Sequence, residues 1–439
     1  MATKKNPELT GYLPDDTPPF WKLIFFALQQ VIVMFPATVL VALLTGFHVS
    51  TTVFASGLAT IGFLLVTRGR IPLYYGSSFS YIAAVAAITG VKQFGEIATD
   101  LAISQAQCGI IASGLVSIVA GLIINRFGKK QVERVLPPVV TGSVAIVIGI
   151  ALAGAAMNSA SSNWTVSVVT LVATILFSVY LRGTLGQLPI LLGVAVGYAV
   201  SAMIGAVDYS VISAAPVFTT PHFTFPSWSP AAMLAIMPVA IATIPESTAH
   251  LYQIDLYVNN LAKRLGREKR YNISNLLGSS LVGDGLGDMI AGALGGPAGT
   301  NYGENNSVMA ITRNFSVPVL AVAALVAIAL SFLGKLAGAV NSVPNAVIGG
   351  VSVYLFGVIG VQGVALMISE KVDLFSSKTL AIAATVLVIG IGGTFAFPSG
   401  MIPVFGISLP AIATAAIFGI LLNIVFQLFP GPDAAAAEK

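Results

Sequence analysis

The sequence predicts an all-α polytopic membrane protein, and three features of its composition lead to that class. Hydrophobic residues make up 56% of the 439 positions, and charged residues only 9%. Soluble proteins carry charges at about 25% of their positions, so this chain has too little polar surface to cover itself in water. Its 44 glycines fit closely packed membrane helices. A soluble globular enzyme is therefore excluded.

The same composition excludes other kinds of partner and site. The formal net charge is +4, but the basic residues are scattered between apolar segments, so we expect no nucleic-acid partner. The single cysteine, Cys108, can neither form a disulfide within the chain nor complete a zinc site. We expect no metal and no cofactor, and the lipid bilayer as the surrounding medium.

The chain contains fourteen candidate membrane segments, since a crossing helix needs about 20 mostly apolar residues. Their approximate bounds are 20–46, 50–67, 71–91, 100–125, 135–157, 163–181, 185–206, 230–251, 273–294, 299–312, 315–340, 346–368, 378–396 and 403–428. Residues 1–19 are polar and lack the apolar run of a signal peptide. We expect a cytoplasmic tail at 1–19, one seven-span half at 20–206, a second at 230–428 and a cytoplasmic tail at 429–439.

The basic residues test this segment count through the positive-inside rule. With both termini in the cytoplasm, 19 of the 21 basic residues fall on the cytoplasmic side. Only Lys92 and Lys335 fall on the other side. The cluster from Lys263 to Arg270 marks the largest cytoplasmic loop. The pattern predicts an even number of spans in the cell membrane with both ends inside.

Two of the fourteen segments do not read as ordinary spans. Segments 71–91 and 299–312 begin with polar, Gly-rich sequence and become apolar only for a short stretch. Tyr75–Ser80 aligns with Tyr302–Ser307 on a shared Tyr-Gly and a shared final Ser. They are the third and tenth segments, and an odd offset of seven predicts two halves with opposite orientation. Paired, interrupted helices in inverted repeats are typical of secondary transporters with a substrate site near the midplane. The alternative is a chance likeness between Gly- and Ser-rich helices.

Glu246 and His250 are the first polar candidates inside the membrane. They are four residues apart in the eighth segment and so share one helical face, just beyond Pro245, which favours a kink. Ionisable groups at this depth are costly and are functional candidates by default. A carboxylate beside an imidazole can hold and pass a proton, so we assign proton coupling to this pair. The alternative is a structural pair that joins two helices.

Glu304 and Phe79 are candidates at the two interrupted segments. Glu304 begins the short helix of the tenth segment, where free backbone N–H groups and the helix dipole favour an anion. A capping role alone is the alternative. Phe79 occupies the corresponding position in the third segment and can stack on a flat ligand, although packing is the commoner role of an aromatic residue.

Asp284 and Asp288 raise a hypothesis from a different class. Gly283–Asp288 contains the Gly-x-Gly-Asp motif of intramembrane aspartyl proteases, which need a second aspartate within Tyr-Asp on another helix. No Tyr-Asp occurs in this chain, and Asp284 and Asp288 lie on one predicted helix. The sequence therefore predicts no enzyme.

Residues Glu304–Arg313 now point to a family, because they resemble the signature of the nucleobase–ascorbate transporters. That signature is Gln or Glu followed by Asn-x-Gly-x-x-x-x-Thr-Arg. Glu at the first position is similar to the bacterial uracil permeases, whereas the xanthine and urate branch usually carries Gln. The likeness covers nearly the whole chain and continues through Gly76–Phe79, Glu246 with His250, Asp284–Gly285 and Gly357–Gly360.

The resemblance implies a fold and a set of binding roles. The fold has fourteen spans in two inverted seven-span repeats, arranged as a core and a gate domain, with short strands in the third and tenth segments and a homodimeric assembly. Glu246 and Glu304 would hydrogen-bond the base, His250 would lie beside it, Phe79 would stack, and the backbone at Tyr302 and Gly303 would contact it.

The resemblance implies uracil import by proton symport, with three departures from the family pattern. Ser307 replaces the signature Gly, Gln30 stands where many uracil permeases have His, and Phe356 where Tyr is common. Because Gln30 cannot titrate, proton coupling would rest on Glu246 and His250. A xanthine, urate or other nucleobase permease, an anion transporter of the same fold and a passive channel are the alternatives.

Overall fold

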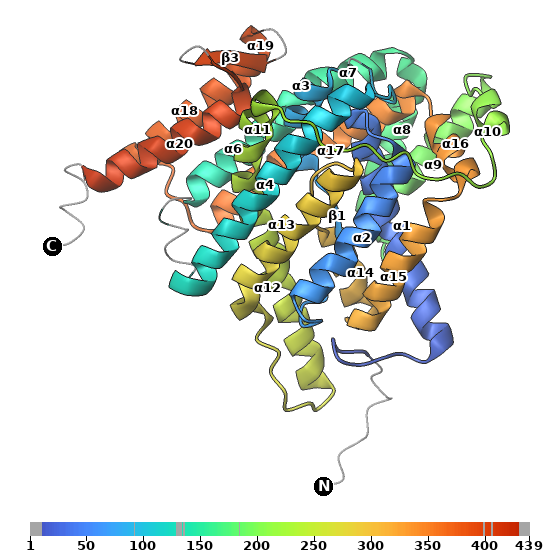
Figure 1. Ribbon diagram of the computed structural model, residues 1–439, viewed down its shortest axis with the longest axis horizontal. Coiled ribbons are helices and arrows are strands. Elements are labelled where there is room, and N and C mark those ends of the chain that lie inside the picture. Colours follow the sequence, from blue (N-terminus) through green and yellow to red (C-terminus); the bar gives the residue numbers. More distant parts are fainter. Residues whose placement is uncertain are drawn as a thin grey trace.

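The computed structural model describes residues 11–91, 93–128, 134, 137–183, 185–397, 400–404 and 407–429, and most of them are helical (Figure 1). Each of the fourteen expected segments contains at least one helix. Eight helical stretches in the described residues are long and apolar enough to cross a membrane alone: 20–45, 49–66, 100–127, 138–161, 230–264, 345–369, 377–396 and 411–428. Fourteen crossings remain a prediction.

The first half of the chain begins with long helices and contains one short strand. Its elements are α1 (Phe20–Thr45), α2 (Val49–Val66), β1 (Tyr75–Ser77), η1 (Phe79–Tyr81), α3 (Ile82–Thr89), α4 (Asp100–Phe127), α6 (Pro138–Ala151), α7 (Ala153–Ser161), α8 (Trp164–Tyr180), η2 (Leu185–Gln187), α9 (Pro189–Met203) and α10 (Ser210–Ala214). Local sequence sets the ends: α1 stops at Gly46, whose φ of +77° suits glycine, and Thr99 caps the start of α4.

The second half also interrupts its helices. Its elements are α11 (Pro230–Ile236), η3 (Met237–Val239), α12 (Ala240–Arg264), η4 (Ile273–Leu276), α13 (Leu277–Leu294), β2 (Gly299–Asn301), α14 (Gly303–Thr312), α15 (Val317–Leu330), α16 (Gly334–Asn341), α17 (Asn345–Ser369), α18 (Ser377–Leu387), the π-helical η5 (Val388–Gly392), α19 (Gly393–Ala396), β3 (Met401–Val404), β4 (Ile407–Pro410) and α20 (Ala411–Leu428).

Two of these elements depart from the sequence expectation. The expected segment 403–428 begins with a strand, because β3 and β4 form an antiparallel hairpin and helix α20 starts only after Pro410. The expected segment 230–251 ends too early, because α12, the helix that carries Glu246, continues to Arg264. The short strands expected in the third and tenth segments lie at Tyr75–Ser77 and Gly299–Asn301.

The helices pack as two groups, and each group draws on both halves of the chain. In the first, α13 packs against α4 and α2, and α15 packs against α2 and α1. In the second, α17 packs against α6, α7 and α8, while α18 packs against α6 and α20. In Figure 1, α18 and α20 extend away from the first group. The sequence halves 20–206 and 230–428 are therefore interleaved in space.

Part of the expected N-terminal tail is docked onto the first group. Tyr12 N–H donates to the Arg313 carbonyl over 2.8 Å, and Leu13 is fully buried. Asp16 forms an ion pair with Arg267 at 3.2 Å, which joins this segment to the loop after α12. The remaining tail residues, 1–10 and 430–439, lie outside the described residues, as do Lys92, Lys129 and Lys130.

Paired glycines let α4 and α13 touch along their backbones. A Cβ on Gly114 would lie 2.5 Å from the Gly285 carbonyl, and a Cβ on Gly121 would lie 2.5 Å from the Gly278 carbonyl. Small residues at a crossing allow this approach between membrane helices. The α4–α13 contact fixes the position of α13, and α13 in turn holds the two short strands.

We expect Gly121→Ala to destabilise the protein by about 1–3 kcal/mol, because its methyl group overpacks the α4–α13 crossing. Melting temperature in detergent measures the effect. Gly357→Ala is the matched control, since no atom lies within 4 Å of a Cβ on Gly357. An equal melting temperature for Gly121→Ala and the unmodified chain would contradict the close crossing.

Candidate functional site

The two interrupted segments meet in an antiparallel strand pair. Tyr75 pairs with Asn301, Gly76 with Thr300 and Ser77 with Gly299. The chains approach so closely that a Cβ on Gly299 would lie 2.2 Å from the Gly76 carbonyl. Since each strand leads into a short helix, η1–α3 or α14, both helices begin at this strand pair.

Two aspartates of α13 hold the strand pair in place. Asp288 Oδ1 accepts from the Tyr75 hydroxyl at 2.6 Å and from the Gly299 N–H at 2.8 Å, so it forms a hydrogen bond with each strand. Asp284 Oδ2 accepts from Ser247 Oγ at 2.6 Å and from Asn301 Nδ2 at 3.2 Å, which joins α12 to β2. These contacts give both aspartates a positioning role. The sequence pattern suggested a protease motif here and missed that role.

Tyr302 joins the end of β2 to β1 and to α1 through hydrogen bonds. Its hydroxyl donates to the Ser77 carbonyl at 2.9 Å and lies 2.9 Å from Thr38 Oγ1. Its N–H donates to the Tyr74 carbonyl at 2.9 Å. The Tyr302 N–H is therefore occupied, whereas Gly303, the other residue whose backbone was expected to contact the base, begins α14.

The first turn of α14 offers free backbone donors beside a carboxylate. The Asn306 N–H donates to the Tyr302 carbonyl, and no side chain caps the helix. The N–H groups of Gly303, Glu304 and Asn305 therefore have no partner within the helix. Glu304 lies in this first turn, as the sequence predicts, and it is half-buried.

Glu246 and His250 face this turn from α12. Ser80 Oγ donates to Glu246 Oε2 at 3.3 Å, which ties the carboxylate to the start of α3. Glu246 is close enough to His250 and Glu304 for their charges to act on it. The structure thus brings together Glu246, His250 and Glu304, which are the three ionisable residues proposed from sequence.

The partners of His250 define its neutral tautomer. Nδ1 lies 2.9 Å from both the carbonyl oxygen and the side-chain oxygen of Asn301. Both are acceptors, so Nδ1 carries a proton, and in the neutral form of the ring Nε2 keeps its lone pair. Asp284 orients the Asn301 amide by accepting from its nitrogen. A series of hydrogen bonds therefore runs from His250 through Asn301 to Asp284. The sequence patterns did not reveal these bonds.

The other residues that the sequence singled out do not all lie at this centre. Phe79 begins η1, is half-buried and packs against the main hydrophobic cluster. Gln30 Oε1 accepts from Asn305 Nδ2 at 2.8 Å, and Ser307 Oγ donates to the Gly303 carbonyl at 3.1 Å. Phe356 is buried on α17 and lines an apolar cavity of about 360 Å³ between α6, α7 and α17, which none of the six predicted binding residues lines.

A methyl group at Gly303 is expected to displace His250, because a Cβ there would lie 2.6 Å from Nε2. His48 and His222 can be replaced by Gln so that His250 is the one remaining imidazole. Nitrogen NMR should then report an Nδ1–H tautomer in the parent chain and lose that preference in Gly303→Ala. Each lost hydrogen bond costs about 1 kcal/mol. An Nε2–H tautomer in the parent, or no change in Gly303→Ala relative to Gly357→Ala, would contradict the assignment.

Solved structures share this fold. The transmembrane domain of a cyanobacterium bicarbonate transporter, BicA, aligns with a TM-score of 0.54 at 15% identity, over 92% of this chain and 97% of that chain. The murine Solute Carrier 26 family member A9 anion transporter in the inward-facing state aligns with a TM-score of 0.58 at 9% identity, over 97% of this chain and 73% of that chain. At these identities the likeness shows the fold alone.

Sequence relatives identify the family. A sequence model of a family described as Permease family, Xan_ur_permease, matches residues 21–399. The uracil permease of Bacillus caldolyticus is 39% identical over 96% of this chain and 95% of its own length. The uracil permease of Bacillus subtilis is 35% identical over 97% of both chains. The protein is therefore an integral membrane protein of the permease family that the signature at Glu304–Arg313 indicates, and it belongs with transporters and not with enzymes.

Proposed function

We propose that this protein imports uracil by proton symport across the cell membrane. The observation that carries the proposal is the meeting of Glu246, His250 and Glu304 at the free backbone donors of α14. The two Bacillus relatives named uracil permease, which match almost the full length, support the substrate.

The groups at the site complement the edges and face of uracil. Uracil has two N–H donors, two carbonyl acceptors and a flat ring. The carboxylates of Glu246 and Glu304 accept from N–H groups, and the free N–H groups at the start of α14 donate to a carbonyl. Phe79 can cover the ring face. In this assignment the backbone donor comes from Gly303, because the Tyr302 N–H already donates to the Tyr74 carbonyl.

The tautomer of His250 provides a physical link between the proton and the substrate. Neutral His250 offers a lone pair at Nε2, while protonated His250 offers a donor there. Only the protonated form can donate to a uracil carbonyl, so a substrate bound in that way favours proton uptake, and a proton favours the substrate. Glu246 lies beside it as a second proton acceptor. Gln30 cannot take this role.

The arrangement also suggests how the site is opened to each side. We infer that the two helix groups move against each other as a core and a gate around the strand pair. The antiparallel pairing of β1 and β2 agrees with two inverted seven-span repeats. Asp16 and Arg267 meet at the end of the molecule that the positive-inside rule assigns to the cytoplasm, so both termini would lie inside. A homodimer is the assembly that the family resemblance implies.

Two alternative substrates have less support, one because of the charges at the site and the other because of the named relatives. An anionic substrate such as bicarbonate or sulfate would face the carboxylates of Glu246 and Glu304, which repel it. A xanthine, urate or other nucleobase permease would use the same chemistry in a larger site, but the relatives cited above carry the name of uracil permeases.

Uptake of labelled uracil into proteoliposomes tests the proposal. We expect an inward proton gradient to accelerate saturable uptake, and unlabelled uracil to compete better than thymine, xanthine or hypoxanthine. Competition by xanthine but not by uracil would contradict the substrate. A rate of uptake that does not depend on the proton gradient would contradict symport. If that rate also does not saturate with uracil concentration, the protein would be a channel.

Glu304→Gln tests the carboxylate directly. Because charged hydrogen bonds contribute about 1.5–3 kcal/mol, we expect uracil to bind on the order of 10- to 100-fold more weakly. Binding to the purified protein is measured by calorimetry, and the melting temperature confirms folding. Glu370→Gln, at the exposed end of α17, is the matched control and should bind normally. Unchanged affinity in Glu304→Gln would remove Glu304 from the site.

A further inference from the structure

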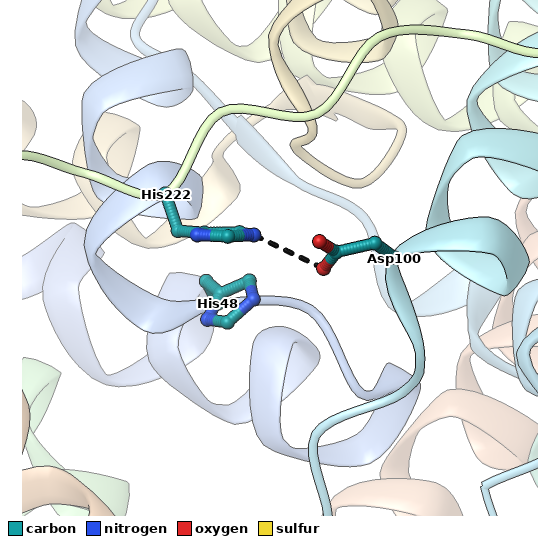
Figure 2. A group of neighbouring side chains, drawn as sticks. All are labelled: His48, Asp100 and His222. Carbon is teal, nitrogen blue, oxygen red and sulfur yellow. Dashed lines mark hydrogen bonds and ion pairs between the residues drawn. The ribbon is translucent and has the colours of Figure 1, made fainter.

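Three potential metal ligands meet at the end of the molecule away from the loop after α12. His48 lies between α1 and α2, Asp100 is the first residue of α4, and His222 lies in the connector 215–229 between α10 and α11. Figure 2 shows their side chains converging. One ligand atom from each lies within 4.8 Å of the others, and His222 Nε2 is 3.0 Å from Asp100 Oδ1.

The surrounding contacts fix where these side chains are presented. Thr51 Oγ1 donates to the His222 carbonyl at 2.7 Å, and Thr52 Oγ1 donates to the His48 carbonyl at 2.9 Å. The two imidazole rings lie 4.4 Å apart between centroids, tilted by 46°. The connector is therefore attached to the start of α2 at the same place where the ligands meet.

A second attachment lies immediately after His222. Thr224 Oγ1 donates to Gln107 Oε1 at 2.9 Å, and Gln107 Nε2 donates to the Thr224 carbonyl at 2.8 Å. Phe223 packs edge-on against Phe54 with ring centroids 5.1 Å apart. Backbone fixed at His222 and immediately after it lowers the cost of holding the imidazole in one place.

The donor set suits a divalent transition-metal ion. Two imidazoles and one carboxylate bind zinc at about 2.0–2.2 Å, and three protein ligands leave a position for water. Neutral imidazole is the form that binds metals.

We propose that His48, Asp100 and His222 form a binding site for a divalent transition-metal ion that tethers the connector 215–229 to α2 and α4. The site shares no residue with the candidate uracil site, and it departs from the expectation of no metal. The connector leads from α10 into α11, which packs against α4, so bound metal restrains the chain where it enters the first group. If no metal binds, His222 and Asp100 form only an exposed hydrogen bond.

Zinc titration of the purified full chain, without a polyhistidine tag, tests the site. We expect one equivalent of Zn²⁺ to bind and raise the melting temperature. His48→Gln, Asp100→Asn and His222→Gln should each weaken binding at least about tenfold. Zn²⁺ should also slow amide hydrogen exchange in the connector of the parent chain.

Two matched controls separate this site from other zinc ligands. Asp208→Asn removes an exposed carboxylate that precedes the connector, and His250→Gln removes the one other histidine; both should bind Zn²⁺ as the parent does. No binding by the parent, equal binding by the three ligand variants, or loss of binding in His250→Gln would overturn the site. Unchanged hydrogen exchange with Zn²⁺ bound would overturn the tether.

Discussion

The strand pair β1–β2 is the constraint on which the rest of the structure depends. Extended backbone deep in a membrane protein is tolerated only if its polar groups find partners inside the protein. Here the strands pair with each other, and Asp288 and Asp284 of α13 fix them through Tyr75, Gly299 and Asn301. Those aspartates can reach the strands because glycines bring α13 into backbone contact with α4. A membrane helix crossing therefore determines the position of a six-residue sheet.

The geometry of the candidate site follows from this sheet. Because β2 ends at Asn301, α14 begins at Gly303 and leaves its first N–H groups free beside Glu304. Asn301 also presents two oxygens to His250, so the sheet that starts the helix sets the tautomer of the imidazole. One structural unit thus provides the substrate donors, the carboxylate and the orientation of the proposed proton carrier.

The sequence predicted a helical membrane fold and singled out residues that the structure brings together in the candidate site, because both depend on local patterns. Apolar segments located a helix in every expected region, and the Gly-rich starts of segments 71–91 and 299–312 located the interruptions. The spacing of Glu246 and His250 placed them on one face. The β3–β4 hairpin was missed because its residues were counted into an apolar span. Features that need distant partners were also missed: the hydrogen bond of Asp288 to Tyr75, and the meeting of His48 with Asp100 and His222. No local pattern encodes a contact between residues more than fifty positions apart.

The central claim is that substrate binding and protonation of Glu246 or His250 are one coupled event. Calorimetry of uracil binding in two buffers that differ in ionisation enthalpy measures it most directly, because proton uptake adds the heat of buffer ionisation. The account predicts different heats in the two buffers near neutral pH, corresponding to net proton uptake by the complex. Identical heats in both buffers across the pH range would contradict it.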